Sequence, residues 1–396
     1  MDQSFISSPA VGESLVAAAR ALQNDLSKNC RAGEEARRIP EANVDMLRQA
    51  DLLRVMVPKR LGGHGASMAT QIAVSAALAK GCPATAWVQT LLNVTTWGMS
   101  FLPEDGQREV FFNGEQPLAC GVLSMGGTAS PVEGGYLING KWPYASGCFH
   151  ANWAAGGVAI LDKDGALYDV GTACMHMSDL TIEDTWKVVG MRGTGSNTLV
   201  AENVFVPTCR IGPGATPGAE MAEQLHGTES ADRWPVASAL ALVLCGPILG
   251  TAEAALEATA ASANSKAIAY TTFPRWVDSH VAMRNIGKAA MDIEAARLLI
   301  MSAATAVDAL EAGQTLDALG RARLRGACGH AMELLRSAVD LLMSTAGASA
   351  FAEASPLQRY WRDLNTGSRH AFLGSDLSYE QLGRTMLGES DIMIIV

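Results

Sequence analysis

The chain has 396 residues, of which 48% are hydrophobic and 18% charged, and its formal net charge is −10 at pH 7. This length exceeds one ordinary hydrophobic core and predicts two or three domains, and the composition is that of a folded globular protein. The acidic balance and the lack of a long basic run exclude a nucleic-acid surface as the main function.

The cysteines and the first residues indicate a cytoplasmic protein. Eight cysteines are spread through the chain without a CxxC pair, so neither a zinc site nor a disulfide framework is expected. The start, MDQSFISSPAVGESLV, lacks a basic segment followed by an apolar one, so we expect no signal peptide. The uncharged stretch 234–252 contains Gly246 and Pro247, and a buried bundle helix is preferred to a membrane span.

Residues 1–115 are predicted to form a helical domain. Leu15, Ala19 and Leu22 repeat at the spacing that places side chains on one helix face. The loop RLGGHGAS interrupts the helical pattern with three glycines. The segment PATAWVQTLLNVTTWGMSF, at 83–101, is apolar almost all round and is therefore predicted to be a buried helix.

Residues 116–225 are predicted to be a domain of short strands. Asn139-Gly140 and Asp164-Gly165 each separate alternating apolar and polar runs, which is typical of hairpins. Several short strands of this kind predict a small β-barrel or a sandwich.

Residues 226–396 are again predicted to be helical. Ile293, Ala296 and Ile300 recur at three- and four-residue steps, and a further long helix is expected from about 316 to 346. The predicted fold is therefore mainly α, with a central β-barrel and a C-terminal four-helix bundle. No β-α-β alternation supports a Rossmann fold. The wide apolar bundle surface would also suit a subunit interface.

Several segments resemble the acyl-CoA dehydrogenase superfamily, in the order in which that superfamily has them. They are GKWPYASGC (140–148), WKVVGMRGTGSNTLVAENVFVP (186–207), WVDSHVAMRNIGKAAMDIEAARLLIMSAA (276–304) and PLQRYWRDLNTGSRHAFL (356–373). The resemblance implies the superfamily's N-terminal helical domain, middle β domain and C-terminal bundle. It also implies a homotetramer, or else a homodimer.

The C-terminal signature distinguishes two branches of this superfamily. In many of the dehydrogenases a glutamate follows the RD signature within a YEG tripeptide and removes a proton alpha to a thioester. Here the corresponding places after Arg362-Asp363 hold His370 and Ala371, so that base is missing. Glu380 is a possible substitute, although a surface carboxylate is the preferred interpretation. RDLNTGSRHAF instead resembles the flavin-dependent hydroxylases, which are oxygenase components of two-component monooxygenases.

The hydroxylase resemblance implies a definite chemistry. Reduced FAD or FMN would come from a separate NAD(P)H:flavin reductase and react with O2 through a flavin C4a-hydroperoxide. The reaction would hydroxylate an aromatic or heteroaromatic substrate, such as a phenol, an indole-like ring or a polycyclic natural product. This chemistry needs a dry pocket and one controlled proton group. It needs no metal, and no residue cluster with metal-ligand spacing occurs in the sequence.

The resemblance assigns His370 and Ser146 as the catalytic candidates. His370 would lie beside flavin and substrate, and imidazole can give or take a proton near neutrality, so it could deprotonate a phenol or protonate the departing peroxide oxygen. The alternative is a histidine packed in the bundle. Ser146 would hydrogen-bond flavin N5, Gly147 would let the backbone approach the ring, and Trp142 would either pack on the flavin or fill the barrel.

Other candidate residues surround these two. The backbone amides of four residues would bind the flavin's pyrimidine edge, unless this is an ordinary strand and turn: Leu123, Ser124, Met125 and Gly126. Arg192 would lie near the flavin or the substrate entrance, or in a solvated turn. The substrate wall, or alternatively ordinary core, would be Trp87, Asn93 and Trp97.

One departure from the dehydrogenases concerns the adenine half of FAD. Their RxxFG arginine motif is absent, and the matching region reads KAIAYTTFPRW, where Lys266 or Arg275 could substitute. The departure suits a flavin that diffuses in and out. Three rival functions remain open: an acyl thioester dehydrogenase, an N- or S-oxygenase on the same scaffold, and an inactive binding protein.

Overall fold

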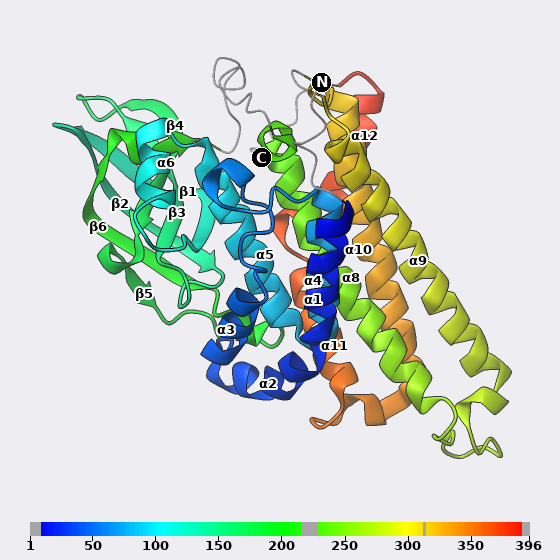
Figure 1. The fold of residues 1–396 in the computed structure, drawn as a ribbon. Helices are drawn as coiled ribbons and strands as arrows, with labels where there is room; N and C mark the ends of the chain where they lie inside the picture. Colours follow the sequence, from blue (N-terminus) through cyan, green and yellow to red (C-terminus); the bar gives the residue numbers. More distant parts are fainter. Residues whose placement is uncertain (1–8, 215–228, 312–313, 390–396) are drawn as a thin grey trace.

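Helices from both ends of the chain pack together beside one β-sheet in the computed structural model, which describes residues 9–214, 229–311 and 314–389 (Figure 1). The N-terminal helices are α1 (Pro9–Ala21), α2 (Gln23–Ala36), α3 (Glu41–Gln49), α4 (Met68–Gly81), α5 (Pro83–Gly98) and α6 (Glu104–Phe111). The predicted buried helix is α5, whose first position is Pro83. Proline is favoured there because the first helical N–H has no partner within the helix.

The sheet contains seven strands in the order β5-β6-β2-β1-β3-β4-β7. Their bounds are β1 (Ala119–Val132), β2 (Gly135–Ala145), β3 (Trp153–Leu161), β4 (Leu167–His176), β5 (Thr181–Glu183), β6 (Asn197–Pro207) and β7 (Ile211–Pro213). The pair β1 and β3 is parallel, and the other pairs are antiparallel. Because β5 and β7 do not pair with each other, the sheet is open in the described part of the chain, and the predicted closed barrel is not confirmed.

One of the two predicted hairpin turns was wrong. Asn139 and Gly140 lie inside β2, and the chain turns between Val132 and Gly135 instead. At Gly140 the register against β6 shifts, and a β-carbon would lie 2.5 Å from the backbone of Gly127 on β1. The glycine therefore permits a close strand approach and does not form a turn. The second turn is confirmed, since Gly165 adopts a φ of +82° between β3 and β4.

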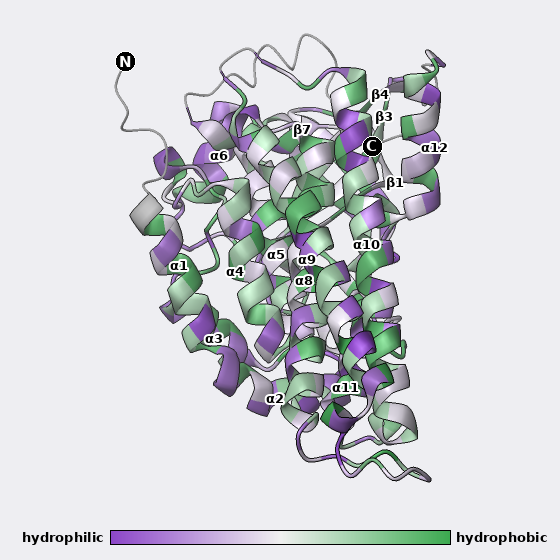
Figure 2. Ribbon diagram, turned by 90° about the vertical axis from the view of Figure 1, so that its right-hand side faces the viewer, coloured by the Kyte–Doolittle hydropathy of each residue, from purple (hydrophilic) through white to green (hydrophobic). Residues whose placement is uncertain are grey.

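The C-terminal helices are α8 (Val236–Ser262), α9 (His280–Asp308), α10 (Ala318–Ala346), α11 (Pro356–Gly367) and α12 (Ser375–Met386). Among the described residues, α8 alone is long and apolar enough to cross a membrane, but 89% of that stretch is buried inside the protein. Figure 2 shows α8 among α4, α9 and α10, coloured largely as hydrophobic. Gly250 brings α8 against α4, because a β-carbon there would meet the Ala76 carbonyl at 2.0 Å. This helix is therefore the core of the bundle.

Candidate active site

Ser146 lies directly after β2 and belongs to a buried chain of hydroxyl groups. Its Oγ is 2.6 Å from Ser196 Oγ, which is itself 2.6 Å from Thr194 Oγ1. Thr194 Oγ1 donates to the Met191 carbonyl at 2.9 Å, and the Trp87 indole Nε1 donates to Ser146 Oγ at 3.2 Å. The three hydroxyl residues are at most 4% exposed. Ser146 is thus held from two sides, by the turn before β6 and by α5.

Trp87 also contacts His370, and so joins the two predicted catalytic residues. The centroids of the indole and imidazole rings are 5.9 Å apart. His370 immediately precedes a short 3-10 helix, Ala371–Leu373, between α11 and α12. The predicted catalytic residues therefore both contact one buried indole, which itself is 5% exposed.

The state of the imidazole favours one of its two predicted roles. Burial lowers the pKa of His370 from 6.5 to about 4, so the ring is neutral near pH 7. Its Nδ1 accepts the backbone N–H of Phe372 at 3.3 Å, and the proton of the neutral ring is therefore on Nε2. In this state His370 can donate a hydrogen bond through Nε2 and is a poor base.

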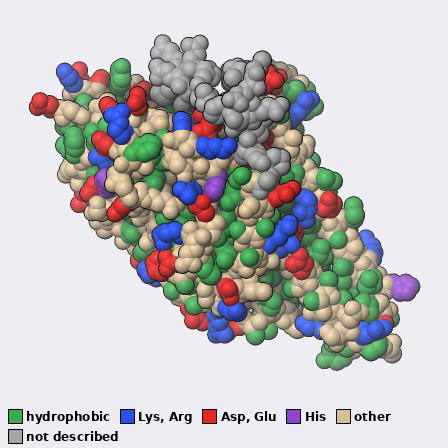
Figure 3. All heavy atoms as spheres, in the orientation of Figure 1, with side chains coloured by type: hydrophobic (Ala, Val, Ile, Leu, Met, Phe, Trp, Pro, Cys, Tyr) green, Lys and Arg blue, Asp and Glu red, His purple; other side chains and the backbone are tan. Residues whose placement is uncertain are grey.

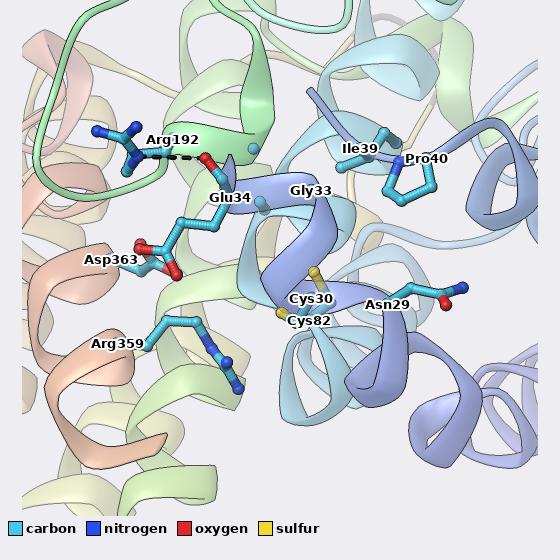
Figure 4. Close-up of a pocket in the computed structure, with 12 residues that line it drawn as sticks. Asn29, Cys30, Gly33, Glu34, Ile39, Pro40, Cys82, Arg192, Arg359 and Asp363 are labelled. Carbon is cyan, nitrogen blue, oxygen red and sulfur yellow. Dashed lines mark hydrogen bonds between the residues drawn. The ribbon is translucent and has the colours of Figure 1, made fainter. Parts of the chain in front are cut away.

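The RD signature holds the turn that carries the hydroxyl chain. Asp363 is 5% exposed, and its Oδ1 accepts the backbone N–H of Met191 at 2.6 Å. Burial raises the pKa of Asp363 to about 6. Arg362 pairs with Glu34 and donates to the Val189 carbonyl. Figure 4 shows Asp363 beside Glu34, at the end of α2. Helix α11 therefore fixes the turn from which Thr194 and Ser196 project.

The ladder of β1 is interrupted where the flavin edge was predicted. Its register with β3 passes from Val122 opposite Gly156 to Met125 opposite Gly157, so residues 123–124 bulge out. The pairing of β1 with β2 begins only at Gly127, and in the described residues no strand covers the other side of the earlier half. Backbone donors and acceptors outside a regular ladder suit the polar edge of a flavin ring.

Helix α5 connects this bulge region with Ser146. A β-carbon at Gly147 would lie 3.0 Å from Val88 Cγ1, and one at Gly121 would lie 2.8 Å from Thr95 Cγ2. These two contacts on α5 are about 10 Å apart at 1.5 Å per residue. Gly147 also adopts a φ of +76°, which favours glycine. The segment of β1 before the bulge, Ser146 and, through Trp87, His370 thus border the same helix.

Tyr144 was missed in the sequence although it precedes Ser146 by two residues. It adopts a φ of +69°, which is costly for a residue with a β-carbon, and its ring is 67% exposed. The ring meets Trp186 edge-on at 6.0 Å. The only available signal was its place beside Ser146. Thr194 and Ser196 were also missed, although they stand beside Arg192 in the segment GMRGTGS.

The structure places two predicted substrate residues away from this site. Asn93 is fully buried, and its amide donates to the carbonyls of Leu52 and Gln89 while its oxygen accepts from Met56 N. Trp97 is 1% exposed, and its Nε1 donates to the Ala231 carbonyl. Neither side chain has a free polar atom to offer a ligand. Both residues are therefore part of the protein core, which was the alternative interpretation.

Two predicted flavin residues are also engaged elsewhere. Trp142 is 1% exposed, donates to the Gly157 carbonyl at 2.8 Å and fills the sheet interior, which is the packing alternative. Arg192 donates to the carbonyls of Glu34 and Val188, and Figure 4 shows it directed toward α2. Its guanidinium therefore binds two backbone carbonyls of the protein.

The remaining charged candidates lie on the surface. Glu380 is exposed and pairs with Arg384 at 2.8 Å, as the surface interpretation predicted. Arg275 pairs with Asp278 at 2.6 Å, and the Lys266 ammonium lies 5.6 Å from the centre of the Trp276 ring. Glu380 therefore does not replace the base that the dehydrogenases carry.

Replacing Asn93 with alanine tests its placement in the core. The change removes the acceptor of the buried Met56 N–H, so the free energy of unfolding should fall by about 1–3 kcal/mol. The substrate KM should change by less than about twofold, because no ligand contact is lost. Urea unfolding and steady-state kinetics measure both quantities. A large rise in KM at unchanged stability would return Asn93 to the substrate wall.

Comparison with known proteins agrees with this arrangement. Residues 13–111 match the acyl-CoA dehydrogenase N-terminal domain, and residues 242–375 match the acyl-CoA dehydrogenase C-terminal domain. The chain is therefore built on the acyl-CoA dehydrogenase fold.

Individual relatives narrow the family further. The chain is 31% identical over 375 residues to the flavin-dependent monooxygenase oxygenase subunit HsaA of Rhodococcus jostii, covering 93% of this chain and 97% of that protein. It is 28% identical to the oxygenase component of an FADH2-dependent resorcinol hydroxylase of Rhizobium sp., covering 91% and 90%. The structure of XiaF from Streptomyces sp. in complex with FADH2 superimposes with a TM-score of 0.91 at 32% identity and 97% coverage of both chains. The chain belongs to the oxygenase components of the flavin-dependent monooxygenases.

Proposed function

We propose that this protein takes reduced FAD or FMN from a separate NAD(P)H:flavin reductase and uses O2 to hydroxylate an aromatic or heteroaromatic ring, with phenols as the preferred class. The observation that carries the proposal is the contact of both Ser146 and a neutral His370 with the buried Trp87 indole. Reduced flavin supplies the two electrons of the reaction and activates O2 when it is bound.

Each residue of the site has a separate task in this proposal. The backbone of residues 123–126 binds the polar edge of the flavin, and Tyr144 covers part of its ring. Ser146 hydrogen-bonds the flavin at N5. Trp87, which contacts both Ser146 and His370, excludes water from the site.

His370 supplies the hydrogen bond that favours a phenolic substrate. Its Nε2–H points to an oxygen acceptor, either the substrate hydroxyl or an oxygen atom derived from O2. The name of the resorcinol hydroxylase component agrees with this substrate class. A dehydrogenase of acyl thioesters needs a carboxylate base, and Glu380 on the surface does not supply one.

Assembly into a homotetramer or a homodimer is part of the same proposal. The outer face of α9 exposes three large apolar side chains, Met283, Met291 and Leu298, which are 45%, 66% and 62% exposed. A second copy of the chain would cover them.

On the face shown in Figure 3, Lys and Arg side chains are interspersed with Asp and Glu, an arrangement unlike a nucleic-acid surface.

Isotopically labelled dioxygen tests the proposed reaction. FAD or FMN, reduced by light without any nicotinamide or reductase, is supplied to the protein together with a panel of phenols and indoles. We expect a hydroxylated product that carries one oxygen atom from O2, and none when the flavin is supplied oxidised. A product whose new oxygen atom comes from water and carries no label, or the absence of product across the panel, would refute the proposal.

A further inference from the structure

The hydrogen bonds of the hydroxyl chain are all satisfied together in only one direction. Each hydroxyl group has one proton to donate. Thr194 donates its proton to the Met191 carbonyl at 2.9 Å. The 2.6 Å contact between Thr194 and Ser196 must therefore be donated by Ser196. With that proton used, the 2.6 Å contact between Ser196 and Ser146 must be donated by Ser146.

This direction leaves Ser146 without a proton for any ligand. One of its lone pairs accepts the indole N–H of Trp87, which can only donate. The other lone pair is free. Because Ser146, Thr194 and Ser196 are 4%, 2% and 4% exposed, water has little access to replace a member of the chain. Toward a ligand, Ser146 is therefore an acceptor only.

We infer that Thr194 and Ser196 are positioning residues that make Ser146 select reduced over oxidised flavin; this inference rests on the proposed function. Reduced flavin carries a hydrogen on N5 and can donate it to Ser146. Oxidised flavin presents a bare lone pair at N5, and two facing acceptors repel. An oxygenase fed by a separate reductase gains from both effects, because it must bind the reduced form and release the oxidised form.

The direction of the chain is imposed from inside the protein. Asp363 holds the Met191 N–H, and the Met191 carbonyl also accepts the Trp186 indole N–H at 3.0 Å. In a Thr194→Val variant the carbonyl keeps the Trp186 hydrogen bond, and valine has nearly the shape of threonine. Ser196 would then be free to donate to Ser146, and the Ser146 proton would turn toward the ligand.

Anaerobic titration tests the inference through binding alone. The Kd of the reduced and of the oxidised form of the same flavin is measured for the parent, for Thr194→Val and for Thr194→Ser. We expect the parent to bind the reduced form at least tenfold more tightly. Thr194→Val should lower that ratio by about tenfold, the size of one neutral hydrogen bond, largely through tighter binding of oxidised flavin. Thr194→Ser keeps the hydroxyl and should keep the ratio.

A second variant guards against a folding defect. Ser196→Ala removes the acceptor of the Ser146 proton by another route and should shift the ratio in the same direction. If the parent binds both flavin forms and the folded variants leave the ratio unchanged, the inference is overturned. Tighter binding of oxidised flavin by the parent would overturn it as well. If the parent binds neither form, the proposed function itself fails.

Discussion

Replacement of His370 by alanine should lower the rate of hydroxylation by about 10²-fold, the usual effect of removing one positioned hydrogen-bond donor, and should thereby lower the yield of product per O2 consumed. Reduced-flavin binding should change little, because the hydrogen bond between Trp87 and Ser146 does not involve His370. Product analysis and an oxygen electrode measure the yield. Equal coupling in the variant and the parent would remove His370 from the mechanism.

The same variant should have a distinct dependence of stability on pH. The folded pKa of His370, about 4, lies below its ordinary value of 6.5, so between these values the unfolded chain binds a proton that the folded chain does not. The contribution of neutral His370 to the free energy of unfolding is therefore present above pH 6.5 and is lost as the pH falls toward 4. Asp363, whose pKa is raised from 3.8 to about 6, acts in the opposite direction in both proteins. The difference between parent and variant in urea unfolding therefore isolates His370.

Replacement of Asp363 by alanine should lower the free energy of unfolding by about 2–3 kcal/mol, because the N–H of buried Met191 loses a charged acceptor. Reduced-flavin affinity should fall as well, since the turn that carries Thr194 and Ser196 loses its anchor. Asp363→Asn is the matched control, because its amide oxygen can still accept the hydrogen bond. Denaturant unfolding and flavin titration give the two quantities. Identical losses in the alanine and asparagine variants would contradict the role of this hydrogen bond.

The order of the elements could be predicted because it follows from hydrophobic periodicity. Helix α5 is apolar on almost every side and is buried. For α8, Pro247 and the glycines favoured a packed bundle helix over a membrane span. The conformation at Asn139-Gly140 could not be predicted correctly, because the structure has a continuous strand there and not a turn. The same dipeptide that favours a hairpin also permits a close approach within β2, and only the neighbouring strand decides between them.

The site was predicted only as far as the resemblance extended. Ser146 and His370 were named from matching segments, and α5 brings them together. Asn93 and Trp97 follow Trp87 by six and ten residues, which places them about 120° and about 80° around the helix from Trp87. The direction of the hydroxyl chain depends on a carbonyl, two side chains and a turn that meet only after folding.

The most direct test of the account mixes the anaerobic complex of protein and reduced flavin with O2 and follows the return of oxidised-flavin absorbance, with and without an aromatic substrate. The account predicts a slower return than for free flavin and, with a substrate, nearly one product molecule per O2. Return at the rate of free flavin, with all the oxygen recovered as hydrogen peroxide, would contradict it.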